Sequence, residues 1–208
     1  KQHYQPIAIG RNIMIIPAWL DNPEPARTAI RIDPGMAFGT GTHPTTQLCL
    51  ELIEDFIPKN NGAEAGIDII DLGCGSGILS IAALKLGARR ALGVDIDADA
   101  IRASQENAKT NQVFEKLELG IGSLEDVISG KFSFHNAPLV LANILAPIII
   151  QLLQEGLGNL LTPDGVMILS GILAEQAPDV QTACEKQGLA LIENRQIGDW
   201  VALVVKKG

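Results

Sequence analysis

Short apolar runs alternate with amphipathic segments over the chain from about residue 67 onward. Strands are expected at 67–72, 91–94, 117–119, 139–142, 166–170, 189–195 and 200–205. Helices are expected between them, at 78–86, 98–109, 147–161 and 175–187. Strands that alternate with helices are typical of a largely parallel sheet that is covered on both faces. The pattern therefore predicts an α/β fold.

The first part of the chain follows a different pattern. Residues 1–32 are irregular and rich in proline, and the apolar runs 7–9 and 13–16 flank Gly10-Arg11-Asn12, which predicts a short hairpin. Pro44 suits the first turn of a helix whose apolar face repeats down to Phe56. We expect residues 1–62 to hold this hairpin, a lid loop and the first helix, and residues 63–208 to form the α/β core.

One apolar stretch, residues 138–153 (PLVLANILAPIIIQLL), resembles a membrane span. It is shorter than the ~20 apolar residues that a spanning helix needs, and Asn143 and Pro147 interrupt it. A buried strand followed by a buried helix is the better interpretation. The N-terminus carries no signal-peptide pattern and no initiator Met, so we expect a cytoplasmic chain, either a fragment or a processed protein.

Composition limits the classes of function. The 208 residues are 47% hydrophobic with a mean hydropathy of +0.21, enough to fill a core and exclude general disorder. Lys and Arg number 16 against 24 Asp and Glu, which gives a net charge of −8. Such a field repels phosphate backbones, so direct nucleic-acid binding is disfavoured, and it attracts a basic partner. Alternatively, the acidity only maintains solubility.

Cysteine and histidine usage argues against a metal site and a disulfide framework. The three cysteines form no CxxC pair, and His3, His43 and His135 are scattered along the chain. An odd number of widely spaced cysteines fits a reducing compartment.

A glycine-rich turn, Asp71-Leu72-Gly73-Cys74-Gly75-Ser76-Gly77, separates an expected strand from an expected helix. Gly73 and Gly75 allow a sharp turn and close approach of a ligand, and the helix N-terminus behind them offers free N–H groups. Asp95 ends the next strand, where a carboxylate can accept hydrogen bonds from both hydroxyls of a ribose.

The spacing of the glycines discriminates between nucleotides. The dinucleotide fingerprint GxGxxG requires glycine where this chain has Ile78, which disfavours a nicotinamide oxidoreductase. Asp71, two residues before the first glycine, is better suited to a ligand with an ammonium group than to a pyrophosphate. S-adenosylmethionine combines a ribose, an adenine and such an ammonium. The alternative is a tight turn without a ligand.

Asn143 stands at the end of the apolar run 139–142, at the edge of the sheet where ligands bind. Its side-chain oxygen and the following backbone carbonyl can accept hydrogen bonds from an amine and so point the nitrogen lone pair at a methyl donor. Alternatively, Asn143 is only the N-cap of the helix that includes Pro147.

The segment 33–46, DPGMAFGTGTHPTT, is dense in glycines and hydroxyl side chains. Such a segment can close over a ligand, and Phe38, Thr42 and Thr46 are the candidates for contact with it. The alternative is a flexible loop with a helix cap. A general-base role for His43 is a further hypothesis.

These segments, together with GVDIDADAI and LANILA, resemble the ribosomal protein L-eleven methyltransferases (PrmA-type). The resemblance implies a Rossmann-like class I methyltransferase with a seven-stranded, mostly parallel sheet, and S-adenosyl-L-methionine as cofactor. It implies that Thr46 contacts the cofactor, that the loop with Gly73 and Gly75 holds its methionine part, and that Asp95 binds the ribose. It places Asn143 where cofactor and acceptor amine meet, and Ser123 or Leu124 beside the adenine.

The resemblance also implies the acceptors, which are lysine side chains and an N-terminal amine of a basic ribosomal protein. We expect no metal, no direct nucleic acid and no membrane partner, and a monomer. The substrate-recognition domain that the family carries before its catalytic domain is expected to be absent from this chain. Alternatives are methylation of another nitrogen, such as protein glutamine, whose enzymes carry an NPPY-type turn, or a truncated cofactor-binding module.

Overall fold

The computed structural model describes residues 5–32, 41–58 and 66–208. Its main feature is a seven-stranded sheet in the order β6-β5-β4-β7-β8-β10-β9. The strands are β4 (Asp68–Leu72), β5 (Arg90–Asp95), β6 (Leu117–Ile121), β7 (Ala137–Asn143), β8 (Leu161–Leu173), β9 (Leu189–Ile197) and β10 (Trp200–Lys207). The strands from β6 to β8 run parallel, whereas β10 is antiparallel to β8 and β9. The predicted fold class is confirmed.

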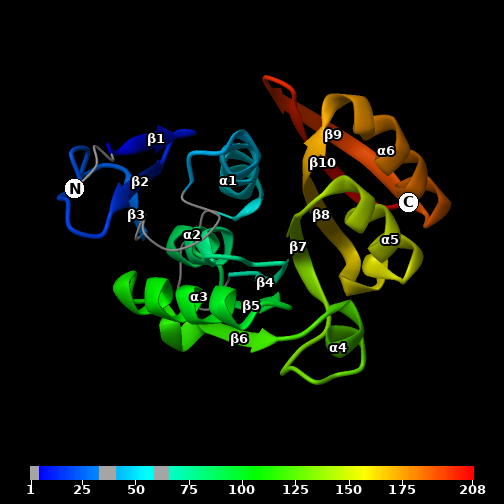
Figure 1. Cartoon of the computed structure of the whole chain (residues 1–208), viewed down its shortest axis with the longest axis horizontal. Coiled ribbons are helices and arrows are strands. Elements are labelled where there is room, and N and C mark those ends of the chain that lie inside the picture. Colours follow the sequence, from blue (N-terminus) through cyan, green and yellow to red (C-terminus); the bar gives the residue numbers. More distant parts are fainter. Residues whose placement is uncertain (1–4, 33–40, 59–65) are drawn as a thin grey trace.

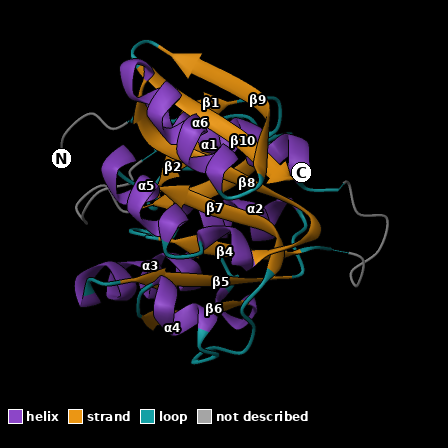
Figure 2. Ribbon diagram, turned by 90° about the vertical axis from the view of Figure 1, so that its right-hand side faces the viewer, coloured by secondary structure: helices purple, strands orange, loops and turns teal. Residues whose placement is uncertain are grey.

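Helices cover both faces of this sheet (Figure 1 and Figure 2). One face packs against α1 (Pro44–Phe56), α2 (Ile78–Leu86) and α3 (Ala98–Thr110). The other packs against α4 (Leu124–Ile128), α5 (Ala146–Gln154) and α6 (Ala177–Lys186). Short 3-10 turns are formed by Phe114–Lys116, Leu157–Leu160 and Ala174–Gln176.

Alternation along the strands divides the core into two layers. In β7, Leu139 and Leu141 pack with α1 and α2, whereas Val140 and Ala142 pack with α5 and α6. Successive side chains of a strand point to opposite faces, so a strand that is covered on both faces is apolar throughout. This explains why residues 138–153 resemble a membrane span. Among the helices that the structure describes, none has the length and apolar character to cross a bilayer.

A separate three-stranded sheet is formed by β1 (Ile7–Ile9), β2 (Ile13–Pro17) and β3 (Thr28–Ile32). The predicted hairpin is confirmed, because β1 pairs with β2 in antiparallel register. Strand β3 was not expected, and it runs parallel to β2. Its flanks are rich in proline and polar residues, which hid a strand that depends on a partner distant from it in sequence.

The outer edge of β3 is closed by a side chain. Asn111, at the end of α3, accepts a hydrogen bond from the Arg31 N–H at 2.8 Å and donates one to the Arg31 carbonyl at 2.6 Å. Asn111 is only 3% exposed. The amide of Asn111 thus pairs with Arg31 as a neighbouring strand would.

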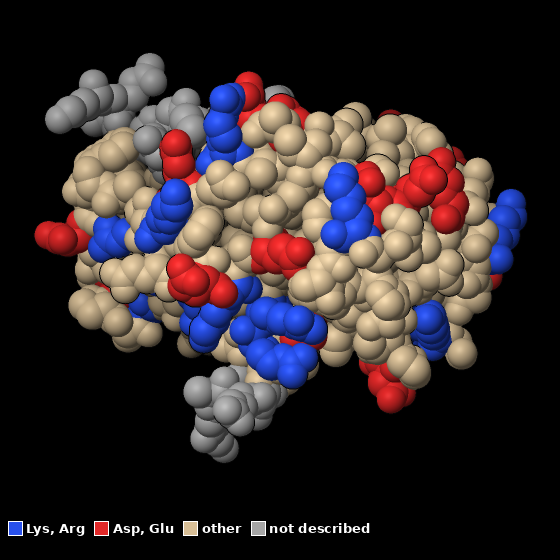
Figure 3. All heavy atoms as spheres, turned by 90° about the horizontal axis from the view of Figure 1, so that it is seen from below, with Lys and Arg blue, Asp and Glu red and all other residues tan. Residues whose placement is uncertain are grey.

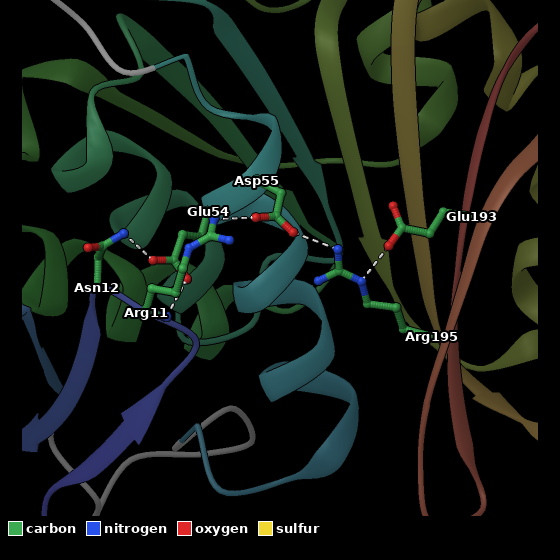
Figure 4. A network of polar contacts seen from close by, with 6 residues as sticks. All are labelled: Arg11, Asn12, Glu54, Asp55, Glu193 and Arg195. Carbon is green, nitrogen blue, oxygen red and sulfur yellow. Dashed lines mark hydrogen bonds and ion pairs between the residues drawn. The ribbon is translucent and has the colours of Figure 1, made fainter.

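A polar network links three parts of the chain that are distant in sequence (Figure 4). The Asp55 carboxylate of α1 accepts hydrogen bonds from Arg11 of the first turn and from Arg195 of β9, each at 2.5 Å. Arg195 also donates to Glu193 at 2.5 Å. The hydrogen bond from Arg195 is the largest cause that lowers the pKa of Asp55. Exposed ion pairs contribute only about 0.2–1 kcal/mol each, so the network adds little to the stability of the fold.

In the second half of the chain, two predicted elements have other bounds than expected and one helix was not predicted. The helix predicted over 147–161 ends at Gln154, because Gly156 adopts a left-handed φ of 101° and stops it. Strand β8 is longer than the predicted 166–170. Helix α4 was missed, since five residues are too few to show helical periodicity.

The amino edge of the parallel strands carries a cluster of paired charges. The Asp68 carboxylate accepts two hydrogen bonds from Arg89, both at 2.7 Å, and two from Arg90, at 3.1 and 3.0 Å. Burial alone would raise the pKa of Asp68, but the hydrogen bonds and charges of the two guanidinium groups outweigh it and lower this pKa. On the face seen in Figure 3, basic and acidic side chains are interspersed.

Candidate functional site

A cavity of about 610 Å³ opens at the carboxyl ends of β4, β5 and β7. Its volume lies within the range of typical small-molecule sites. The wall includes five residues that the sequence predicts for the site: Thr46, Gly73, Gly75, Asp95 and Asn143. It also includes residues that were not predicted to line it, among them Ile78, Leu145, Gly171 and Trp200. Residues from distant parts of the chain therefore meet at one edge of the sheet.

The glycine-rich turn between β4 and α2 forms the floor of the cavity. Gly73, Gly75 and Gly77 have φ values of 75°, 54° and 77°, a region that favours glycine. The N–H groups of Gly73 and Cys74 both donate to the Val94 carbonyl, at 2.8 and 3.0 Å. The turn is therefore fixed to the end of β5.

Helix α3 holds the same turn from the other side. The Ser104 hydroxyl donates to the Gly75 carbonyl at 2.7 Å, and the Asn107 amide donates to the Ser76 carbonyl at 2.9 Å. Ser104 and Asn107 are buried. These bonds occupy carbonyls of the turn and leave its conformation set before any ligand binds.

Asp95 stands where β5 ends and faces the cavity. Its Oδ2 atom accepts a hydrogen bond from the Gly75 N–H at 2.9 Å, and its Oδ1 atom accepts one from the Asp97 N–H at 3.0 Å. Each carboxylate oxygen has a second lone pair, so the oriented carboxylate keeps acceptor capacity for two hydroxyl groups.

Asp71 lies beneath the turn and is not part of the wall formed by the described residues. It is 1% exposed and accepts a hydrogen bond from the Ser80 hydroxyl at 2.7 Å. Burial raises the pKa of Asp71 to about 6, and the nearby charge of Asp95 adds to the rise against the hydrogen bonds from Ser80. Asp71 can act on a ligand only electrostatically, through the turn.

Asn143 is the last residue of β7 and lines the cavity. The N-cap of α5 is Leu145, which makes no side-chain hydrogen bond. The alternative interpretation of Asn143 as a helix cap is therefore wrong. Its side chain is left for the cavity, beside the apolar side chains of Ile144 and Leu145.

Part of the predicted lid lies in the described residues. Thr46 lines the cavity and is 4% exposed. His43 also lines it and caps α1, since its Nδ1 atom accepts from the Thr45 N–H at 3.3 Å. Thr42 lies outside the wall formed by the described residues, and its carbonyl accepts from Gln47 at 2.8 Å. Phe38 lies outside the described residues, so its role stays a prediction.

Ser123 and Leu124, of which one was expected beside an adenine, are not among the described residues that line the cavity. Ser123 caps α4, with its N–H donating to the Asp126 carboxylate at 2.9 Å, and Leu124 is buried. Among the described residues, no group of His, Cys, Asp and Glu could hold a metal ion. The cysteines Cys49, Cys74 and Cys184 are buried free thiols.

Two wall residues come from the antiparallel part of the sheet and were missed. Trp200, the first residue of β10, contacts the His43 ring edge-on, with ring centroids 4.8 Å apart. Gly171 lies within β8. No local motif marks either residue, because both reach the cavity through strand pairing that spans the C-terminal half of the chain.

Comparison with known proteins identifies a family whose members are similar to this chain over its whole length. The family model for ribosomal protein L11 methyltransferase (PrmA) matches residues 1–208. A ribosomal protein L11 methyltransferase of an Exiguobacterium species is 40% identical over 100% of this chain and 63% of its own length. One of a Synechococcus species is 43% identical, over 100% of this chain and 67% of its length. The chain thus spans about two thirds or less of the length of such relatives.

Solved structures agree with the observed topology. The ribosomal protein L11 methylase of Lactobacillus delbrueckii subsp. bulgaricus is 34% identical, with a TM-score of 0.86, and the match covers 98% of this chain and 99% of that one. A tRNA methyltransferase of Bacillus subtilis is 20% identical with a TM-score of 0.60 over 76% of this chain and 65% of its own. This second likeness shows a shared fold alone.

Proposed function

The chain belongs to the ribosomal protein L11 methyltransferase family, and from this we propose that it transfers methyl groups from S-adenosylmethionine to amine nitrogens of a ribosomal protein. The acceptors are lysine side chains and an N-terminal amine. The observation that carries the proposal is the cavity in which the glycine turn, Asp95 and Asn143 converge at one edge of the sheet.

The residues of the cavity fit this cofactor. The left-handed glycines expose backbone at the floor, where a side chain would fill the space needed by the methionine part. Asp95 is held by two backbone N–H groups and offers its remaining lone pairs to the ribose hydroxyls. Thr46 supplies a hydroxyl from α1. We assign these three features to cofactor binding, and Phe38 and Thr42 to the lid that closes over it.

The bound cofactor supplies an electrophilic methyl group on a sulfonium. The chain contributes orientation, because Asn143 and the Ile144 carbonyl accept hydrogen bonds from the acceptor amine and direct its lone pair into the cavity. Holding reacting atoms in line contributes about 7–11 kcal/mol in well-oriented systems.

The acceptor amine must be unprotonated when it attacks. A lysine has a reference pKa of about 10.4, and an apolar environment lowers it. Ile78, Ile144 and Leu145 provide apolar side chains on the cavity wall that Asn143 also lines. His43 is a weaker candidate for a base, since its Nδ1 atom is engaged with Thr45.

The net charge of −8 favours a basic protein partner over nucleic acid. The methylated protein of the relatives is a ribosomal protein by their printed names. A glutamine-directed activity is less well supported, because the segment after β7 reads Asn143-Ile144-Leu145-Ala146 without the prolines and tyrosine of an NPPY-type turn. The division at residue 62, the monomeric state and the cytoplasmic location stay predictions.

Calorimetry with S-adenosylmethionine tests the cofactor assignment. We expect Asp95→Ala to weaken binding by about 10- to 100-fold, because the ribose loses two charged hydrogen bonds. The exposed Asp164 lies at the far end of β8, so Asp164→Ala is the matched control and should bind like the unaltered chain. Unchanged affinity of Asp95→Ala would refute the ribose assignment, and stabilisation by NAD in place of S-adenosylmethionine would refute the cofactor itself.

Methylation assays test the acceptor class. The chain is incubated with ribosomal protein L11 and with peptides that carry either free lysine or glutamine. We expect methyl transfer to the ribosomal protein and to lysine peptides. Transfer to glutamine alone would replace the proposed acceptor.

A further inference from the structure

The segment Asn143-Ile144-Leu145 is fastened to β8. Asn143 pairs with Ser170 in the parallel register of β7 and β8. The Ile144 N–H donates to the Ser170 carbonyl at 3.1 Å, one residue beyond the end of β7. The segment that faces the acceptor therefore takes its backbone position from β8, up to Ser170.

At this point β8 departs from regular pairing. Val201 of β10 pairs with Ile172, and Leu203 pairs with Leu169, so one residue of β10 stands opposite the pair Ser170-Gly171 of β8. This is a β-bulge, and Gly171 has a left-handed φ of 85°. Bulges bend a strand and redirect its residues, and they are enriched next to active sites.

Gly171 lies so close to the backbone of Ile144 that a residue with a Cβ atom does not fit at this position. A Cβ atom on Gly171 would lie 2.2 Å from the Ile144 oxygen, 2.7 Å from its carbonyl carbon and 3.0 Å from its nitrogen. All three are backbone atoms, so no rotamer change relieves the clash. A side chain at residue 171 would force the Ile144 peptide to move.

A second glycine lies against Ile144 but has a different effect. A Cβ atom on Gly73 would lie 2.6 Å from Ile144 Cγ2, the end of a side chain that can rotate. Ile144 thus lies between a glycine of the turn after β4 and a glycine of strand β8. Of these two glycines, only Gly171 faces the Ile144 carbonyl itself, so a side chain at residue 171 would displace that carbonyl whereas one at residue 73 would displace only a side chain.

The bulge has a rigid base. Ser170 is fully buried, and its hydroxyl donates to the Val201 carbonyl at 3.0 Å. The neighbouring Trp200 and Gly171 both line the cavity. The antiparallel pair of β8 and β10 therefore holds Ser170, which in turn holds the segment that follows β7.

We propose that Gly171 is a positioning residue for methyl transfer, which sets the place of the Ile144 carbonyl and of the Asn143 side chain that receive the acceptor amine. The proposal rests on the proposed function, and it adds a residue that does not itself touch the reacting atoms. Gly171 acts through Ile144, by the absence of a side chain.

The test compares Gly171→Ala with Gly130→Ala in the 208-residue chain. Gly130 has a φ of 82°, and nothing lies within 4 Å of the place its Cβ would take. Both variants carry the same backbone strain, but only Gly171→Ala adds the clash with Ile144. The readouts are the Kd for S-adenosylmethionine, and kcat and KM for ribosomal protein L11.

We expect Gly171→Ala to lower kcat by about 100-fold, since a misplacement of about 1 Å has that effect on oriented reactions. Its Kd for the cofactor should stay within about threefold of the unaltered chain, and Gly130→Ala should match the unaltered chain in kcat. Equal kcat for the two variants overturns the positioning role. Absence of methyl transfer by the unaltered chain overturns the proposed function itself, and the positioning role with it.

Ser170→Ala tests the same bulge should Gly171→Ala fail to fold. It removes the hydroxyl that ties the bulge to β10 but keeps the carbonyl that anchors Ile144. We expect a loss in kcat of about 3- to 10-fold with unchanged cofactor affinity, in line with one lost hydrogen bond. An unchanged kcat in Ser170→Ala overturns the proposal in that case.

Discussion

Strand β4 carries an aspartate near each of its ends, and the two carboxylates have opposite surroundings. Asp68, at the amino edge of the sheet, is paired with the guanidinium groups of Arg89 and Arg90, and its pKa is lowered. Asp71, at the carboxyl edge, is fully buried with the Ser80 hydroxyl as its side-chain partner, and its pKa is raised to about 6. One strand thus carries a carboxylate that is stabilised by two guanidinium groups at one end and, near the other, a buried carboxylate without a cationic partner among the described residues.

The cavity lies at the carboxyl edge of the sheet, the edge near which Asp71 is buried. It holds the left-handed glycines of the turn and exposed apolar residues, among them Ile96 at 81% and Leu145 at 66% exposed. Perturbed pKa values of buried groups and exposed apolar side chains are common at functional sites, where a ligand can cover the apolar surface. The comparison indicates that the amino edge stabilises the fold, whereas the carboxyl edge is arranged for binding.

The strongest test of this division is Asn143→Ala, at the carboxyl edge. Removing the amide that receives the acceptor amine should lower kcat by about 100- to 1,000-fold, similar to the loss of one oriented hydrogen bond to a reacting group. The Kd for S-adenosylmethionine, measured by calorimetry, should change by less than about threefold.

The matched control is Asn194→Ala, because Asn194 is exposed on β9. It should leave both constants unchanged. Equal losses of turnover and cofactor affinity in Asn143→Ala would instead make Asn143 a cofactor ligand.

The next largest effect concerns the free energy of unfolding of Asp71→Asn. An acid with a raised folded pKa favours the folded state at low pH, and this contribution is lost as the pH rises from its unfolded value of 3.8 to about 6. The shift of about two units corresponds to about 3 kcal/mol. Urea unfolding should be measured between pH 4 and 8. The free energy of unfolding of Asp71→Asn should rise relative to that of the unaltered chain up to about pH 6, and the difference between the two should be constant above that pH.

Asp68→Asn should show the opposite dependence. The lowered pKa of Asp68 stabilises the folded chain above pH 3.8, and this stabilisation is lost as the pH falls through the folded pKa. The variant should be less stable at neutral pH and recover in acid, with kcat unaffected. Parallel pH curves for the two variants would remove the contrast between the edges.

The smallest expected effect concerns Trp200, which extends the carboxyl edge into the antiparallel strands. Trp200 lines the cavity, so Trp200→Ala removes aromatic surface that a bound cofactor would cover and should weaken cofactor binding by about 2- to 10-fold. Trp200→Phe keeps a ring against His43 and should lose less. Trp19→Ala removes a tryptophan that is 58% exposed and serves as the control. Indistinguishable affinities for all variants would confine the site to the parallel strands.

The site residues on the parallel strands β4, β5 and β7 could be predicted from the sequence. The turn between β4 and α2, the acid at the end of β5 and the asparagine at the end of β7 each follow a strand directly, so periodicity and glycine spacing place them at one edge. The helix predicted over 78–86 matches α2 as observed, because Gly77 and Gly87 mark its two ends.

The remainder depends on contacts that no local pattern records. The left-handed bulge at Gly171 arises from register between β8 and β10, and Trp200 reaches the cavity through the same pairing. Strand β3 needs β2 and Asn111 to satisfy its backbone groups. Asp71 was expected beside a ligand, but only the packing of α2 shows that Ser80 covers it.

The closure of β3 by Asn111 bears on how this chain behaves at high concentration. An open strand edge invites pairing with another molecule, and such pairing begins many aggregates. The two hydrogen bonds from one buried amide to Arg31 block that route, because an incoming strand would first have to displace both of them. One asparagine at the end of α3 thus protects the edge of β3 at Arg31 from pairing with another strand.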